Sequence, residues 1–302
     1  MSTSEKWTHH DIPDQSGRTV IVTGANSGIG FEAAKALAAK RARVILACRD
    51  RIKCSAAVKS IHSEYPNSNV YALHLDLAEL QSVYRFADAF RSHYRDLDIL
   101  INNAGVMMPP YAKTRDGFEL QFGVNHLGHF VLTGLLIDLL ANNEGARVVN
   151  VSSYAHTVGE LDFDDLNWEK RKYNKVRAYG DSKLANLYFT FELERKLLKA
   201  GTACIAAASH PGWTATNLQR HVSLASLLNP LVGQNSLKGA WTTEYAAVSE
   251  KIGGSDFIGP DGWMQARGHP VQVKAKALAY DRDIAARLWK VSEDLTGVKW
   301  SL

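Results

Sequence analysis

Residues 19–30 read TVIVTGANSGIG, an apolar run that ends in a glycine-rich turn. Gly24, Gly28 and Gly30 have the spacing G-x3-G-x-G, and the Ala-rich stretch 31–40 that follows is typical of a helix. Glycines permit a tight turn and let the backbone approach a pyrophosphate at the positive N-terminus of a helix. The stretch therefore predicts a strand, a phosphate-binding turn and a helix, although a chance glycine turn is the alternative for this motif alone.

Strand-like apolar runs alternate with helical patterns along the chain that follows. The expected strands are 44–48, 70–75, 97–101, 147–151 and 203–208, and the expected helices are 51–64, 80–94, 117–140 and 178–199. Continuous apolar strands separated by helices predict an α/β fold of the Rossmann type, a doubly wound parallel sheet with helices on both faces. Ligands bind such sheets at the carboxyl ends of the strands, where the sequence places its remaining motifs.

The domain organisation follows from where this alternation stops. We expect residues 1–16 to be a polar tail and residues 17–302 to form a single Rossmann-type domain. Two segments, about 158–177 and 217–238, interrupt the regular pattern. Long excursions beside a site are often lids, so we expect a substrate lid there, with surface decoration as the alternative.

Composition argues against a nucleic-acid partner, a membrane span and a metal site. The net charge is +4 over 302 residues and the basic residues are dispersed, so nucleic acid is not an expected partner. No stretch approaches 18 consecutive apolar residues and the N-terminus is polar, so we expect a cytoplasmic protein without a membrane span. Cys48, Cys54 and Cys204 have no metal-ligand spacing, and no metal site is expected.

The segment Tyr179-Gly-Asp-Ser-Lys183 predicts acid–base chemistry. A tyrosine hydroxyl has a pKa of about 10, and a lysine four residues later lies on the same helical face. A positive charge about 5 Å away, at an effective dielectric of about 20, favours the phenolate by roughly 3 kcal/mol. That is about two pKa units, so we expect Lys183 to bring Tyr179 towards the range of a general acid–base.

The motifs TGANSGIG, NNAG, YGDSK and HPG, in this order, resemble the short-chain dehydrogenase/reductase family from about Gly17 to Val298. A finer resemblance is to the subgroup that contains retinol dehydrogenases and their soluble bacterial relatives. The stretches that carry it are ANSGIG, ILACRD, DGFELQFGVNHLGHF, VNVSSYAH, SKLANL, GPDG and ARLWKVSEDLTG.

The resemblance implies a catalytic tetrad at Asn125, Ser153, Tyr179 and Lys183. Tyr179 would exchange a proton with the substrate oxygen, and Ser153, rather than Ser152, would hydrogen-bond that oxygen. Lys183 would hold the nicotinamide ribose, and Asn125 would position a water in a relay to solvent.

The resemblance also implies a set of cofactor contacts. They fall on the glycine-rich turn, the adenine position, the NNAG turn, the tetrad and the HPG loop: Gly24, Asn26, Ser27, Gly28, Ile29, Gly30, Asp76, Leu77, Asn103, Ala104, Gly105, Tyr179, Lys183, Pro211, Gly212, Thr214 and Thr216.

The choice between NADP and NAD depends on the end of the second strand. NAD enzymes place an acidic residue there, whereas this chain has Cys48 followed by Arg49, with Asp50 too late. An arginine can fork onto a 2′-phosphate, so NADP(H) is preferred over NAD(H). Ser27 replaces the basic residue that often provides a second NADP signal, and the alternative is that Arg49 stacks on adenine with either cofactor.

Two departures from the family pattern bear on the site. Ser153 and Tyr179 are 26 positions apart, about twice the usual spacing, which affects the pocket rim. Arg41 stands where the family usually has glycine in a left-handed helix cap, and it would cost roughly 1 kcal/mol in that conformation.

The sequence thus predicts an NADP-dependent oxidoreductase that interconverts a carbonyl and an alcohol, with reduction favoured. The expected substrate is a small molecule with a bulky hydrophobic group. It would contact an apolar wall made by Met107, Met108, Trp213, Leu227 and Leu228, and the alternative is that these residues belong to the ordinary core. Two other functions remain open: a dehydrogenase that oxidises a lipid, terpenoid or sterol alcohol, and a non-catalytic NADP(H)-binding sensor or scaffold. Relatives often form homodimers through the helices around Asn125 and Tyr179, so a homodimer is the assembly that the resemblance implies.

Overall fold

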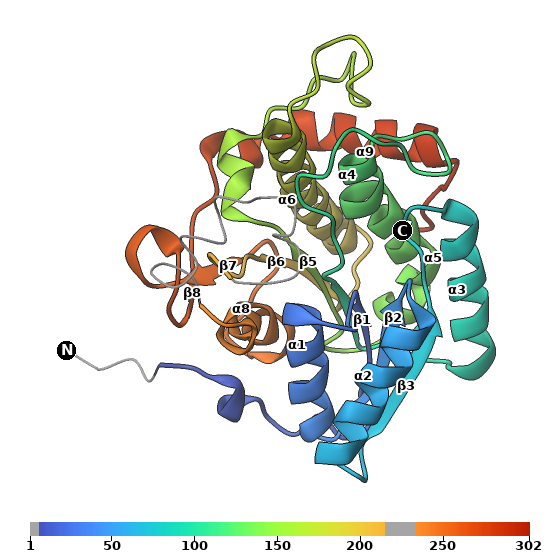
Figure 1. The fold of residues 1–302 in the computed structure, drawn as a ribbon, viewed down its shortest axis with the longest axis vertical. Helices are drawn as coiled ribbons and strands as arrows, with labels where there is room; N and C mark the ends of the chain where they lie inside the picture. Colours follow the sequence, from blue (N-terminus) through green and yellow to red (C-terminus); the bar gives the residue numbers. More distant parts are fainter. Residues whose placement is uncertain (1–5, 215–233) are drawn as a thin grey trace.

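The computed structural model describes residues 6–214 and 234–302 (Figure 1). Thr216, Leu227, Leu228 and most of the expected lid 217–238 lie outside the described residues.

A sheet in the order β3-β2-β1-β4-β5-β6-β7-β8 forms the centre of the molecule. Its strands are β1 (Thr19–Thr23), β2 (Arg43–Cys48), β3 (Asn69–His74), β4 (Ile99–Asn102), β5 (Arg147–Val151), β6 (Ile205–Ser209), β7 (Phe257–Pro260) and β8 (Pro270–Gln272). The first seven pair in parallel, and β8 pairs antiparallel with β7. The order reverses between β1 and β4, so the predicted doubly wound Rossmann-type fold is confirmed.

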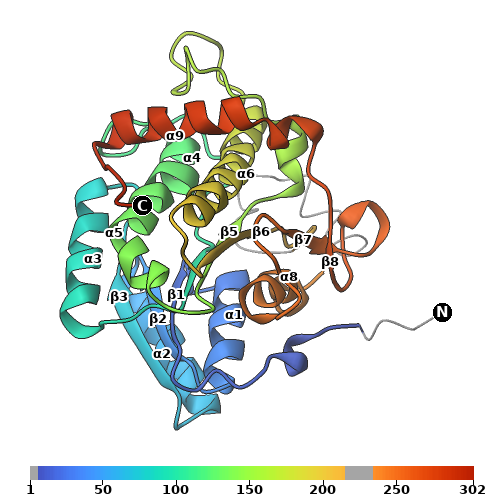
Figure 2. The ribbon, with the colours of Figure 1, turned by 180° about the vertical axis from the view of Figure 1, so that it is seen from behind.

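Helices cover both faces of the sheet (Figures 1 and 2). On one face lie α1 (Gly28–Ala39), α2 (Arg51–Glu64) and α8 (Ser236–Val248). On the other lie α3 (Leu80–His93), α5 (Gly128–Ala141) and α6 (Lys175–Lys199), and α9 (Arg282–Thr296) packs against α6.

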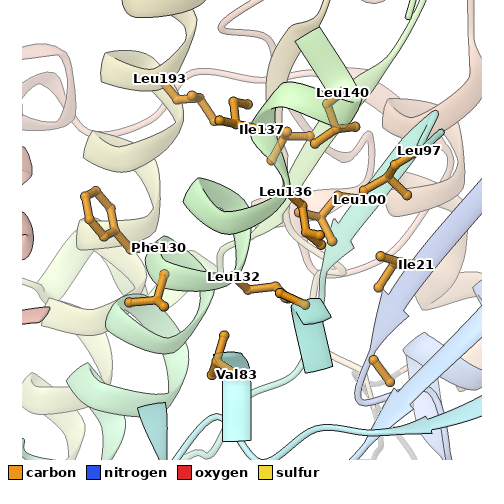
Figure 3. Close-up of a cluster of buried hydrophobic side chains, with 14 of the residues drawn as sticks. Ile21, Val83, Leu97, Leu100, Phe130, Leu132, Leu136, Ile137, Leu140 and Leu193 are labelled. Atoms are coloured by element: carbon orange, nitrogen blue, oxygen red, sulfur yellow. The ribbon is translucent and has the colours of Figure 1, made fainter. Parts of the chain in front are cut away.

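Alternation along the strands explains these two layers. Ile21 contributes to the core beneath α3, α5 and α6, whereas its neighbours Val20 and Val22 contribute to the core beneath α1, α2 and α8. Successive strand side chains point to opposite faces, so an apolar run of this kind supplies both cores. Figure 3 shows the first core, in which Ile21 and Leu100 from the sheet meet Leu132 and Leu136 of α5.

The predicted long helix 117–140 differs from the structure in one informative way. The helical stretch begins later, with the short α4 (Leu120–Phe122), then forms a π-helical turn η2 (Gly123–Leu127) and continues as α5. By length and composition the stretch Leu120–Ala141 could cross a membrane, but 72% of its most apolar window is buried inside the protein. We interpret it as a core helix.

The left-handed position at the end of α1 is confirmed, because Arg41 has a φ of 74°. Its guanidinium pairs with Asp14 at 2.7 Å, and the amide of Gln15 donates to the Lys40 carbonyl. These contacts attach the described part of the polar tail to the end of α1, and Ile12 is buried in the core there.

Candidate active site

The glycine-rich turn between β1 and α1 has the backbone that a phosphate-binding loop requires. Gly24 and Gly28 have φ values of 67° and 61°, which residues with a side chain rarely adopt. A Cβ on Gly24 would lie 2.9 Å from the Ala104 Cα, and one on Gly30 would collide with the Asn103 amide. The helix begins after Ser27, so the amides of its first turn have no intrahelical acceptor and are available to an anion. These features fit the pyrophosphate of a dinucleotide.

A buried hydrogen-bond network joins this turn to the tetrad. The Thr23 hydroxyl accepts hydrogen bonds from the amides of Asn103 and Ala104, each at 2.9 Å, and lies 2.9 Å from His129 Nε2. His129 Nδ1 lies 3.0 Å from the Asn125 carbonyl oxygen, which can only accept, so Nδ1 carries the proton. Burial lowers the pKa of His129 to about 4, which keeps the ring neutral in this role. The network fixes the NNAG turn relative to Asn125.

Tyr179 and Ser153 lie beside each other at the carboxyl end of β5. Tyr179 is on α6 and is 7% exposed, and Ser153 caps the 3-10 turn η3 (Tyr154–Val158). Burial raises the pKa of Tyr179 to about 12, and the hydrogen bond from Ser153 opposes this only in part. The phenol is therefore protonated at neutral pH and can act as a proton donor.

Lys183 lies beside Tyr179, with its Nζ 5.7 Å from the centre of the phenol ring. The Nζ donates to the Val151 carbonyl at 3.0 Å, and burial lowers the lysine pKa to about 8. The expected lowering of the Tyr179 pKa by Lys183 is not seen in this structure: burial raises that pKa, and the group that opposes the rise is Ser153.

The two adjacent serines have different partners. The buried Ser152 hydroxyl donates to the backbone carbonyl of Lys183 at 2.8 Å and so ties β5 to α6. Ser153 is half-buried and accepts a longer bond, 3.2 Å, from the Ala155 amide. The geometry favours Ser153 as the serine that can turn to a substrate oxygen.

Asn125 lies in the π-helical turn and is fully buried. Its side-chain amide binds both the amide and the carbonyl of Val106, at 2.8 and 3.0 Å, and donates to Ser182 Oγ at 2.9 Å. Ser182 in turn donates to the Tyr179 carbonyl at 2.8 Å. The side chain of Asn125 thus holds a loop in this structure, which is a different use from the expected positioning of water. Ser182 was not among the predicted site residues, although it is three residues after Tyr179 and so lies on the same helical face.

The expected adenosine end of the site lies at β2 and β3. Arg49 is exposed, and among the described residues it has no ion pair or hydrogen bond. Asp50 accepts from the Lys53 amide as the N-cap of α2, which accounts for its acidic side chain without a ribose contact. Asp76 accepts from the Ala78 amide, and Leu77 is buried where α5 begins at Gly128. A cavity of about 340 Å³ between α2, β3 and α3 adjoins this region; its lining includes Cys48, Arg51, Cys54 and His74.

The loop after β6 forms the opposite side of the candidate site. Gly212 has a φ of 65°, and a Cβ there would press on the Ala266 carbonyl. The Trp213 amide donates to that carbonyl at 2.7 Å, and the residue as a whole is 41% exposed. Thr214 Oγ1 donates to the Pro211 carbonyl at 2.8 Å. Met107 and Met108 are half-buried.

In residues 6–214 and 234–302, no group of three or more His, Cys, Asp or Glu side chains could hold a metal ion.

Comparisons with known proteins agree with this geometry. A family model for the short chain dehydrogenases matches residues 18–226. The chain is 46% identical to human retinol dehydrogenase 13 over 294 residues, which cover 94% of this chain and 86% of that protein. It is 44% identical to mouse retinol dehydrogenase 12 over 300 residues, covering 97% and 90%.

Solved structures show the same fold. A crystal structure of an uncharacterized protein from Mycobacterium paratuberculosis superposes with a TM-score of 0.84 at 43% identity, covering 98% of this chain and all of that chain. The NADP complex of RhlG from Pseudomonas aeruginosa superposes with a TM-score of 0.66 at 25% identity, covering 83% and 97%. The chain therefore belongs to the short-chain dehydrogenase/reductase family, in its retinol-dehydrogenase-like group, whose members are oxidoreductases that interconvert alcohols and carbonyls with a nicotinamide cofactor.

Proposed function

We propose that the protein is an NADP-dependent reductase of bulky hydrophobic aldehydes or ketones. The observation that carries the proposal is geometric: Ser153, Tyr179 and Lys183 meet at the carboxyl end of β5, with Lys183 Nζ 5.7 Å from the centre of the phenol ring. A protonated phenol beside a hydroxyl suits a group that gives a proton to a substrate oxygen.

The chain's own residues would perform the proton chemistry. Ser153 and Tyr179 hydrogen-bond the carbonyl oxygen and stabilise the negative charge that develops on it, and Tyr179 then transfers its proton to that oxygen. Lys183, whose pKa is about 8, holds an ammonium charge near the phenol and offsets the charge that remains after the transfer. The glycine-rich turn would hold the pyrophosphate of the dinucleotide and Lys183 its nicotinamide ribose, and the bound nicotinamide would supply the hydride.

The preference for NADP rests on Arg49, an exposed guanidinium that is unpaired within the described residues, at the end of β2. Asp50, the nearest acidic side chain in the sequence, is occupied as a helix cap. The solved NADP complex of RhlG supports the same choice.

The substrate class rests on the relatives and on the apolar side chains near the site. The relatives are named for retinol, an elongated apolar alcohol, and Trp213 and Met108 would contact such a chain. The same names favour the second candidate function, oxidation of a lipid-like alcohol. We further propose a cytoplasmic location, which the burial of the most apolar helical stretch supports.

The test is a panel of carbonyls and alcohols that includes retinaldehyde and retinol, followed by the absorbance of NADPH and NADH at 340 nm. The expected result is faster carbonyl reduction with NADPH than with NADH, and a Tyr179→Phe variant that loses turnover but keeps its NADPH affinity within a few-fold. Turnover of alcohols alone would support the dehydrogenase. Tight NADPH binding without turnover of any substrate would support the sensor and refute both enzymes.

A further inference from the structure

Two side chains of one helical stretch hold the same loop of the candidate site. Asn125 binds the amide and the carbonyl of Val106, at 2.8 and 3.0 Å. Four residues earlier, Gln121 accepts a hydrogen bond from the Met108 amide through Oε1, at 2.8 Å. Met108 has a φ of 51°, a conformation that residues with a side chain rarely adopt. The loop 106–108 is therefore fixed at both ends, and the strained end depends on Gln121.

The amide nitrogen of Gln121 holds two further segments. It donates to the Tyr173 hydroxyl at 2.9 Å and to the Lys175 carbonyl at 3.0 Å. Tyr173 belongs to the long segment 158–177 between Ser153 and Tyr179, and Lys175 is the first residue of α6, one turn before Tyr179. Gln121 itself is fully buried, so its three hydrogen bonds are protected from water.

The surroundings of Tyr173 make this arrangement rigid. Its hydroxyl donates to Glu119 Oε1 at 2.9 Å, and the other Glu119 oxygen accepts from the Phe122 amide at 2.7 Å. The Tyr173 ring packs edge-on against Tyr111 at 5.0 Å and Trp168 at 5.7 Å. Buried polar networks whose members are all bonded restrict the structure to one arrangement.

We propose that Gln121 is a positioning residue that fixes the loop 106–108 and the segment 158–177 relative to Tyr179, and that it thereby sets the size of substrate the site accepts. The second clause rests on the proposed function, whereas the first does not. Gln121 touches neither the reacting atoms nor the expected cofactor contacts, so it acts through Met108 and Tyr173.

The first test needs no substrate and measures how firmly Gln121 holds the loop 106–108, an arrangement that we call the clamp. In a Gln121→Met variant the Met108 amide loses its acceptor, and its hydrogen exchange, followed by NMR, should become about 3–10-fold faster. The Val106 amide, which Asn125 still holds, should exchange at the wild-type rate. Equal acceleration at both amides, or none at Met108, would overturn the clamp.

The second test uses two tyrosines of the same aromatic cluster as a matched pair. Tyr173→Phe removes the hydroxyl that Gln121 binds, whereas Tyr111→Phe removes a hydroxyl that donates to the Asn167 carbonyl and leaves Gln121 untouched. For Tyr173→Phe we expect the KM of the largest carbonyl reduced by wild type to rise about 3–10-fold, with kcat for the smallest one unchanged. Tyr111→Phe should match wild type.

The outcomes separate this inference from the proposed function. Equal effects of the two phenylalanine variants, or a uniform loss of kcat on large and small carbonyls, would show a structural role and overturn the specificity claim. If wild type reduces no carbonyl, the proposed function and the specificity claim fail together, and the exchange experiment still decides the clamp. Tyr173→Phe keeps the ring contacts, so the kinetic test stands even if Gln121→Met does not fold.

Discussion

Glu244 is a buried carboxyl group whose removal should stabilise the protein. It lies on α8 with no exposed surface, and neither of its oxygens has a hydrogen-bond partner among the described residues. Burial raises its pKa well above 4.5, and the charge of Glu32 on the neighbouring α1 adds to this. Burying unpaired polar oxygens costs about 1–3 kcal/mol, so Glu244→Met should raise the free energy of unfolding by about that amount even where the acid is neutral.

The pH dependence provides a sharper test. Because the folded pKa is raised, the folded state binds more protons than the unfolded state from pH 4.5 up to the folded pKa. Below pH 4.5 the titration of this group thus does not change the free energy of unfolding of wild type. Between pH 4.5 and the folded pKa that free energy falls by about 1.4 kcal/mol per pH unit. The difference in unfolding free energy between Glu244→Met and wild type should therefore widen as the pH rises through that window.

Urea unfolding of both proteins at several pH values measures this difference. Glu144→Met, a change at an exposed glutamate, is the control and should stay within about 0.5 kcal/mol of wild type. A variant that is less stable than wild type, or a difference that does not change with pH, would refute the reasoning and indicate that Glu244 is paired in solution.

Three further substitutions test the proposed site. Ser153→Ala should lower kcat about 10²–10³-fold, because one donor to a developing oxyanion is lost. Ser152→Ala should lower the stability and affect kcat far less. The reverse order in steady-state kinetics would assign the role to Ser152. Arg49→Ala should weaken NADPH by about 10–150-fold and leave NADH nearly unchanged, because only the 2′-phosphate offers the guanidinium an anion. Equal loss of both cofactors in kcat/KM measurements would make Arg49 an adenine-stacking or structural residue.

The fold was predictable where local pattern and tertiary role agree. The run at Thr19–Val22 and the glycines after it define a strand, a turn and a helix, and the structure has all three. The helix α8 was not predicted, because it buries polar residues such as Thr242, Thr243 and Glu244 and so lacks a clear apolar periodicity.

The site was predictable in its motif residues and less so in its energetics. The structure brings Ser153, Tyr179 and Lys183 together, as the motifs indicate. Burial raises the pKa of Tyr179, and this could not be predicted because burial depends on packing that the sequence does not display. Gln121 and Ser182 could not be singled out for a similar reason. Gln121 binds the Met108 amide and Ser182 binds the Asn125 side chain, both elsewhere in the sequence, and no residue pattern marks such contacts.

The π-helical turn Gly123–Leu127 has an evolutionary consequence. Such a turn is equivalent to one extra residue in an α-helix, and each residue of an α-helix turns the direction of a side chain by about 100°. Deleting one residue from this turn would therefore rotate Gln121 away from Met108 while Asn125 kept its place. The insertion or loss of a single codon here would then release the Met108 end of the loop 106–108 and leave its Val106 end bound to Asn125. The helix would then let substrate range drift between homologues without disturbing the chemistry.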